Sequence, residues 1–241
     1  MRELSNAEIS PLAAAIERQN ADEVQRLLTD YGHTDVLMAY GRTSLHHAAE
    51  KNCDRIAEIL IKNGADMQAR GCFGARTPLQ VAIESSSLET LRKLLNAGAQ
   101  VNALSASGRT TLHFALRHIH SRKGREMLDL ILRHKPDVNV ADEDGITPAD
   151  MAIDYGEEAD LAALLTRGAD PNARIRGQTR LHRLAQGGLP VRYFQLLIEW
   201  GADIHARDDQ GRLPLDIAKE RGRDGLILQV LSEQHGDERP S

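Results

Sequence analysis

Aromatic side chains are scarce in this chain. Only 3% of its 241 residues are Phe, Trp or Tyr, and there is a single Trp. Hydrophobic residues nonetheless account for 41% of the sequence, so the core has to be built from Leu, Ile, Val and Ala. Side chains of this size let neighbouring helices approach closely, as they do in thin stacked layers. The composition therefore favours a core made of layered helices.

Cysteine is nearly absent as well. Cys53 and Cys72 are too few for the disulfide framework of a small secreted protein. They do not form a C-x-x-C pair, and no cluster of other metal ligands accompanies them in the sequence. We therefore expect neither a disulfide framework nor a zinc site.

The sequence also lacks a long hydrophobic segment. No apolar run approaches the roughly 20 residues needed to span a bilayer. The first residues, Met1 to Asn6, include charged and polar groups where a secretion signal needs an apolar stretch. We expect a cytoplasmic protein that does not bind membranes, although a secretion route without an N-terminal signal is compatible with the same sequence.

An excess of positive charge is missing too. The chain has 30 basic and 35 acidic residues, which gives a formal net charge of −5. Sequence-independent binding to nucleic acid depends on a basic surface. We therefore expect no nucleic-acid partner.

What the sequence does contain is a recurring pair of adjacent aliphatic residues. Successive pairs are 33 or 34 residues apart, with one interval of 37 residues. An interval near 33 residues is typical of stacked repeats, in which each unit buries its apolar face against its neighbours. The pairs are Leu27-Leu28, Leu60-Ile61, Leu94-Leu95, Ile131-Leu132, Leu164-Leu165 and Leu197-Ile198.

A four-residue motif recurs in phase with these pairs. A Thr hydroxyl can cap the free amide groups at a helix start, and Pro is tolerated in the first turn. Each motif therefore predicts a short first helix, and the aliphatic pair lies in the second helix that follows. The copies are Ser10-Pro11-Leu12, Thr43-Ser44-Leu45-His46, Thr77-Pro78-Leu79-Gln80, Thr110-Thr111-Leu112-His113, Thr147-Pro148-Ala149-Asp150, Thr179-Arg180-Leu181-His182 and Leu213-Pro214-Leu215-Asp216.

The second helix is followed by a Gly-Ala pair that is typical of a left-handed helix cap, at Gly64, Gly98, Gly168 and Gly201. A short extended stretch and a tight turn come next. Each unit is therefore predicted to be a helix, a turn, a second helix and a projecting hairpin-like loop.

With these two signals in phase over residues 5 to 231, the sequence resembles the ankyrin-repeat proteins. Its bias toward Arg over Lys makes it similar, more narrowly, to stand-alone ankyrin-repeat proteins of bacteria. The resemblance implies an all-α fold, an ankyrin-repeat solenoid of about seven helix-turn-helix units with projecting hairpin loops at residues 1–231. The units are expected near residues 5–37, 38–71, 72–104, 105–141, 142–173, 174–207 and 208–231, with a polar tail at 232–241.

Three departures from the repeat pattern predict less regular units. Arg180 replaces the Pro of the motif, Lys135-Pro136 replaces Gly-Ala, and Leu213 replaces the capping Thr. The fourth unit is also longer than its neighbours, with extra residues near 118–125.

The ten histidines raise the alternative of metal or acid–base chemistry. His46, His113 and His182 occupy the motif position at which the resemblance implies a structural His that hydrogen-bonds between neighbouring repeats. His118 and His120 would point to different faces of a helix, which disfavours joint metal coordination. The sequence contains no hydrolase, metalloprotease or phosphate-loop motif. We therefore expect a protein that is not an enzyme and that needs no cofactor or metal.

Arginine precedes the first residue of the motif in four units, at Arg42, Arg76, Arg109 and Arg212. The resemblance implies that this position lies at the hairpin, on the concave side used for partner binding. Equivalent residues would then form a ladder, with Arg176 nearby. A basic stripe of this kind favours a partner with an acidic patch. The alternative is that these are ordinary solvated hairpin residues.

Five other side chains are expected on the same face: Tyr40, Phe73, Ile146, Tyr155 and Ile175. Aromatic and aliphatic residues flanked by arginines are typical of binding hot spots. Packing against the neighbouring hairpin is the alternative.

The turn between the two helices of the fourth unit is basic, with Arg117, Arg122, Lys123 and Arg125. It is a candidate second contact, and the alternative is an exposed charged loop without a partner.

These expectations lead to a non-enzymatic module, monomeric when unbound, that binds one protein partner on its concave, hairpin-bearing face. One form of this hypothesis is a bacterial immunity protein that neutralises a cognate toxin. Another is a secreted effector or a scaffold that docks on a cellular protein. The alternatives from other classes are a metal-dependent or catalytic protein that uses the His-rich centre, and nucleic-acid binding along the arginine ladder. For the leading hypothesis, changing Arg42, Arg76 and Arg109 together to Glu is expected to weaken the complex with little loss of stability.

Overall fold

The structure, a computed structural model, describes residues 11–31, 41–71, 74–187, 190–223, 225 and 230. It divides into two compact units, Met1–Glu143 and Asp144–Ser241, and each is described by itself. Tyr40, Phe73 and the polar tail at 232–241 lie outside the described residues.

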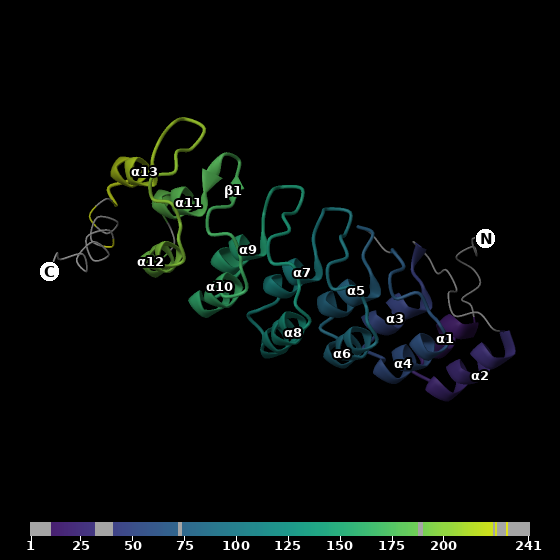
Figure 1. Ribbon diagram of the computed structural model, residues 1–241. Helices are drawn as coiled ribbons and strands as arrows, with labels where there is room; N and C mark the ends of the chain where they lie inside the picture. Colours follow the sequence, from purple (N-terminus) through teal and green to yellow (C-terminus); the bar gives the residue numbers. More distant parts are fainter. Residues whose placement is uncertain are drawn as a thin grey trace. The chain divides into compact units, whose positions relative to one another are not determined.

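The described part of the first unit is made of four helix pairs. In Figure 1 the first helices of the pairs form one row, the second helices form another, and the loops project from the first row. Each helix packs on its own partner and on the equivalent helix of the next pair. The helices are α1 (Pro11–Glu17), α2 (Ala21–Tyr31), α3 (Ser44–Glu50), α4 (Asp54–Lys62), α5 (Pro78–Glu84), α6 (Leu88–Asn96), α7 (Thr111–Arg117) and α8 (Arg122–Arg133).

The second unit continues the same alternation and adds a short two-stranded ribbon. The strands pair antiparallel across the turn at Arg176 and Gly177, where both residues have positive φ. This combination fits a tight hairpin turn of the kind that matches strand twist. The elements are α9 (Pro148–Tyr155), α10 (Glu158–Leu165), β1 (Arg174–Ile175), β2 (Gln178–Thr179), α11 (Arg180–Gln186), α12 (Val191–Glu199) and α13 (Pro214–Glu220).

The core consists of the aliphatic pairs, as their period predicts. At least one residue of every pair is buried, and Leu94 is fully inaccessible to solvent. Leu27, Ile61 and Ile198 are partly exposed. The recurring pair therefore explains how each repeat adheres to the next.

The motif builds both a helix cap and a link between repeats. Thr43 donates its backbone N–H to Nδ1 of His46 at 3.1 Å, and the Thr43 hydroxyl lies 2.9 Å from the same nitrogen. Because Nδ1 accepts the amide proton, Nε2 carries the imidazole proton and donates it to the carbonyl of Arg76 at 2.9 Å. His182 has the same arrangement, with the carbonyl of Arg212 2.9 Å from Nε2. The expected structural role of these two histidines is confirmed.

Helix ends follow the left-handed geometry that the Gly-Ala pairs predict. Gly64, Gly98, Gly168 and Gly201 all have φ between 86° and 91°. Lys135, which replaces this Gly in the fourth repeat, has φ 50°. The repeat imposes the left-handed conformation even where the residue is not glycine.

Candidate partner-binding surface

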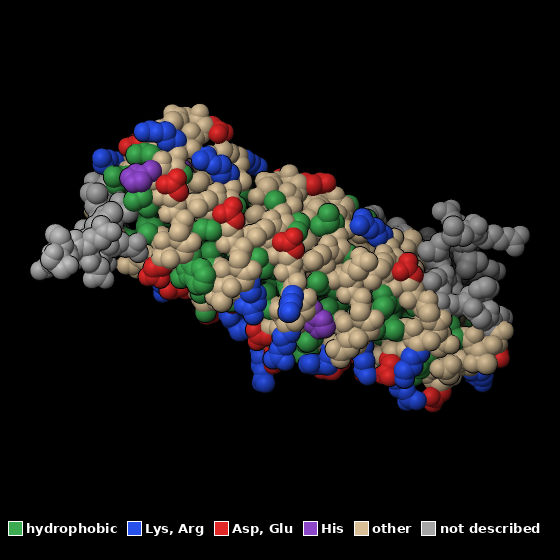
Figure 2. Space-filling view, in the orientation of Figure 1, with side chains coloured by type: hydrophobic (Ala, Val, Ile, Leu, Met, Phe, Trp, Pro, Cys, Tyr) green, Lys and Arg blue, Asp and Glu red, His purple; other side chains and the backbone are tan. Residues whose placement is uncertain are grey.

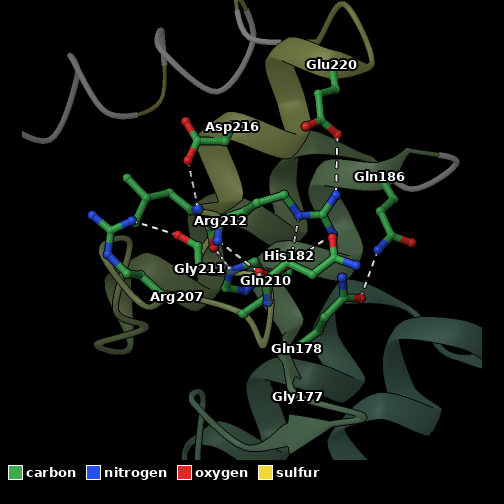
Figure 3. A network of polar contacts seen from close by, with 12 residues as sticks. Gly177, Gln178, His182, Gln186, Arg207, Gln210, Gly211, Arg212, Asp216 and Glu220 are labelled. Carbon is green, nitrogen blue, oxygen red and sulfur yellow. Dashed lines mark hydrogen bonds and ion pairs between the residues drawn. The ribbon is translucent and has the colours of Figure 1, made fainter.

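The exposed side of the first helices has a recurring side-chain contact that joins two positions eight residues apart. The first position directly precedes the first motif residue, and the second is the last residue of the first helix; we call this contact a rung. It is an ion pair for Arg42 with Glu50, for Arg76 with Glu84 (3.1 Å) and for Arg212 with Glu220 (3.5 Å). In the sixth repeat Gln186 Nε2 donates to Gln178 Oε1 at 2.8 Å. Figure 3 shows the last two rungs.

The rungs correct the expectation of an uncompensated basic stripe. Each of the four ladder arginines is half-buried and has a carboxylate partner. The ladder is therefore largely neutralised. Ion pairs that are this accessible to water contribute about 0–1 kcal/mol each, so the rungs order the arginine side chains more than they stabilise the fold.

Arg109 differs from the other ladder arginines because its rung partner is Arg117 rather than Glu. Its Nε instead donates to Oδ2 of Asp142 at 2.9 Å. The Asp142 side chain is only 1% exposed, so Arg109 supplies a cation to a buried carboxylate. The stability of the triple Arg-to-Glu variant is accordingly expected to fall, because a second carboxylate at position 109 would face the buried carboxylate of Asp142.

Arg212 has a second carboxylate besides Glu220. Nε and Nη2 of Arg212 lie 3.0 Å and 2.9 Å from Oδ2 of Asp208. Burial raises the pKa of Asp208, but hydrogen bonds from the backbone and side chain of Arg212 and the backbone of Gln210 outweigh it and lower this pKa to about 2. Asp208 is therefore charged at neutral pH, where it anchors the last hairpin.

The hairpins of the first unit are tied to one another through their backbones. Ala106 donates its N–H to the carbonyl of Gly74 at 2.7 Å, and Glu143 donates to the carbonyl of Ser107 at 3.1 Å. A Cβ on Gly71 would lie 2.5 Å from the carbonyl oxygen of Gly41, so the backbone at these two residues approaches too closely for any other residue at position 71. Backbone hydrogen bonds thus hold neighbouring hairpins, and the side chains that they carry, in place relative to one another.

The other predicted site residues differ in their contacts and in their exposure to solvent. Arg76 lies over the Phe114 ring of the next repeat, 5.6 Å from its centroid. Tyr155 is 43% exposed at the end of α9, Ile146 is half-buried, and Arg176 is exposed on the β1–β2 turn. The structure does not place Tyr40 and Phe73.

A buried ion-pair cluster in the second unit was not predicted from the sequence. Arg180 is 2% exposed and Asp150 is 1% exposed, and Nη2 of Arg180 donates to Oδ2 of Asp150 at 3.2 Å. Arg180 also donates to the Thr147 hydroxyl and the Asp170 carbonyl. Arg183 donates to Oδ1 of Asp150 at 2.9 Å. The signal was available, because Asp150 replaces the motif His and Arg180 replaces the motif Pro in consecutive repeats.

Among the described residues, no three His, Cys, Asp or Glu side chains gather closely enough to hold a metal ion. None of the helices in the described ranges is long and apolar enough to cross a bilayer. Burial raises the pKa of the Cys53 thiol, which favours its unreactive protonated form.

Two family models of ankyrin repeats match the sequence. One, described as ankyrin repeats (3 copies), matches residues 2–71, and the other, described as ankyrin repeats (many copies), matches residues 79–122. Together they cover the part of the chain that forms most of the first unit.

Known proteins with similar sequences are much longer than this chain. Human Rabankyrin-5 is 30% identical over 207 residues, which cover 79% of this chain and 17% of Rabankyrin-5. The nuclear factor NF-kappa-B p105 subunit of Gallus gallus is 31% identical over 153 residues, which cover 61% of this chain and 15% of that protein.

Among solved structures, the crystal structure of the ankyrin repeat domain of Bcl-3, a member of the IkappaB protein family, is similar over almost the whole chain. The TM-score is 0.81 at 25% sequence identity, and the alignment covers 93% of this chain and 100% of the Bcl-3 chain.

Proposed function

Since the chain is an ankyrin-repeat protein, and ankyrin repeats are protein–protein interaction modules, we propose that it binds one protein partner along its hairpins and first helices. Each unit contributes its own rungs and hairpin tips. The proposed contacts are Arg42, Arg76, Arg109 and Arg117 in the first unit and Ile146, Tyr155, Arg176 and Arg212 in the second.

The observation that carries this proposal is the pre-ordering of the surface by the rungs. A partner that binds free long side chains must immobilise them, at about 0.5–1.5 kcal/mol each. Glu50 and Glu84 already hold Arg42 and Arg76, and the Phe114 ring adds a second contact to Arg76. Binding therefore orders fewer side chains than it would on a surface of free arginines.

This arrangement changes the expected chemistry of the partner. The rungs present guanidinium and carboxylate groups in alternation. A partner surface that carries both acidic and basic side chains matches them better than a uniformly acidic patch does. It also weakens the alternative of nucleic-acid binding, which requires a net basic surface.

Binding alone can inhibit, neutralise, sequester or scaffold. Neutralisation of a toxin and docking of an effector are two hypotheses within this function. The similar proteins named above are animal proteins, and they add no support to a bacterial origin or an immunity role.

The test combines capture of the partner with a charge-swapped rung. The tagged protein is used to capture proteins from a lysate of its source cells, and the partner is then purified and its affinity measured by calorimetry. Arg76→Glu alone breaks the rung, whereas Arg76→Glu with Glu84→Arg restores an ion pair of reversed direction. Both variants are expected to weaken the complex at least about tenfold, because the charge that the partner meets at position 76, and in the double variant also at position 84, is reversed.

The swapped double variant separates recognition from folding. Its unfolding free energy is expected to remain within about 0.5 kcal/mol of wild type, because an exposed ion pair is preserved. Failure to capture any stoichiometric protein partner, or an unchanged affinity in the folded double variant, would contradict the proposal.

A further inference from the structure

The turn between α7 and α8 is a basic part of the surface of the first unit. Residues 117–125, which we call the basic turn, contain Arg117, Arg122, Lys123 and Arg125 and no Asp or Glu. In Figure 2 Lys and Arg side chains gather at the lower edge of the molecule, in the region of α8.

The basic turn begins where the repeat pattern loses its acidic residue. The last residue of the first helix is Glu17 in α1, Glu50 in α3 and Glu84 in α5, and it is Arg117 in α7. Arg117 cannot form a rung with Arg109, and within the described ranges it has no ion-pair partner. It therefore leaves a free positive charge beside the rungs.

The start of α8 breaks a second pattern. α2, α4 and α6 have acidic residues in their first turns, where the positive end of the helix dipole stabilises them. α8 instead begins with Arg122 and Lys123 and has no acid in its first turn. Arg122 is 93% exposed and paired only with Glu126 of its own helix, at 3.0 Å. Arg122, Lys123 and Arg125 lie near the positive end of the helix dipole, where positive charge destabilises the helix. A loss of local stability of this kind is typical of residues that serve recognition.

Local contacts nevertheless constrain the backbone of the basic turn. Ile119 is buried, and the Ser121 hydroxyl accepts the N–H of Gly124 at 2.9 Å. A Cβ on Gly124 would lie 1.8 Å from the carbonyl oxygen of His118, so only glycine fits this approach. The exposed side chains of Arg117, Arg122 and Lys123 therefore extend from a backbone that local contacts constrain, which lowers the entropy lost on binding.

We propose that the basic turn binds an acidic segment, rich in Asp and Glu, of the protein partner; this inference rests on the proposed function and identifies one of its contacts. Arg117 occupies the second position of the rung pattern in its repeat and is also the first residue of the basic turn. A partner bound to the rungs can therefore contact the basic turn as well. A short acidic segment fits better than nucleic acid, because the cations are confined to nine residues on a chain of net charge −5.

The experiment uses the whole chain and the double variant R117E/K123E. Glu at position 117 restores the residue type of the other three first helices and can pair with Arg109, so folding is expected to be preserved. The charge-matched control is R26E/R133E, which changes two exposed arginines of α2 and α8 away from the turn. Circular dichroism and thermal unfolding check the fold of each variant.

Binding is measured by fluorescence anisotropy with a short labelled peptide of Glu, Asp and Gly. Single-stranded oligothymidine and phosphatidylserine vesicles are the competing probes. Wild type and R26E/R133E are expected to bind the acidic peptide within about twofold of each other, and R117E/K123E to bind it at least about tenfold more weakly. Equal binding by R117E/K123E and wild type overturns the inference, and so does tighter binding of oligothymidine or vesicles through the same two residues.

The outcomes separate this inference from the proposed function. If the captured partner binds R117E/K123E as tightly as wild type but loses affinity for the Arg76→Glu/Glu84→Arg variant, the function stands and the basic turn is not a contact. If no protein partner is captured, the proposed function fails whatever the peptide shows.

Discussion

At the scale of single residues, Arg180 and Asp150 are two departures from the repeat pattern that compensate for each other. A motif Asp can accept the Thr147 amide, as it does at 3.0 Å, but unlike His it has no proton to donate to the next repeat. A buried carboxylate also needs a cation. Arg180 supplies this charge from the next repeat, at the position where the pattern has Pro.

Arg180→Pro, which restores the motif residue, is therefore expected to destabilise the protein. The loss is about 3 kcal/mol, because the buried Asp150 carboxylate loses its buried cation and keeps the half-exposed Arg183 as its ion-pair partner. Adding Asp150→His restores both motif residues, and this double variant is expected to recover to within about 1 kcal/mol of wild type. Urea unfolding of Arg180→Pro, Asp150→His and the double variant measures the coupling free energy between the two positions. Additive losses would show that the two substitutions are independent.

At the scale of elements, α8 shows how a turn can reverse an intrinsic preference. Glycine in a helix is ordinarily about 1 kcal/mol less favourable than alanine. At Gly124 the close approach of the His118 carbonyl overrides this preference, because the backbone would have to move to admit a methyl group.

Gly124→Ala is expected to destabilise the first unit by about 1–3 kcal/mol, as an overpacked site does. Lys123→Ala, one residue earlier and exposed, is the control and should stay within about 0.5 kcal/mol of wild type. Thermal unfolding of both variants measures the difference. A gain in stability for Gly124→Ala would mean that the turn is not rigid, and would remove one support of the basic-turn inference.

The sequence predicted these elements well because their signals are local. A capping Thr, a Gly-Ala pair and an aliphatic pair each act within one or two helical turns. It predicted the surface less well. Arg42 and Arg76 were recognised as equivalent, but their carboxylate partners lie eight residues away, across a whole helix, and no local rule pairs them. Arg109 was grouped with them although its partner, Asp142, is in the next hairpin.

At the scale of the whole molecule, contacts between repeats add to the apolar core. Lys62 and Lys93 lie 2.8 Å and 2.7 Å from the two carboxylate oxygens of Glu58, and Lys93 belongs to the following repeat. Side-chain hydrogen bonds from these lysines lower the pKa of Glu58 from 4.5 to about 2. The bridge is thus present in its charged form over the whole neutral range.

Because the folded-state pKa of Glu58 is below its unfolded value, its contribution to stability is complete above about pH 4.5 and is lost as the pH falls toward about 2. Glu58→Gln is therefore expected to reduce the loss of unfolding free energy over this interval. Glu89→Gln is the control, since Glu89 has a single ion-pair partner, Arg92, at 3.5 Å. Urea unfolding at several pH values measures how the unfolding free energy of each variant changes with pH. Parallel curves for wild type and Glu58→Gln would contradict the expectation.

The sequence by itself determined the repeat, the helix starts and ends and the buried face of each helix, because these depend on spacing along one chain and on the conformational preferences of single residues. Only the tertiary structure decided which charges meet. Arg180 with Asp150, and Arg109 with Asp142, are 30 and 33 residues apart. Their pairing depends on how one repeat is stacked on the next, and it turned an expected basic stripe into largely neutralised rungs beside the exposed Arg117.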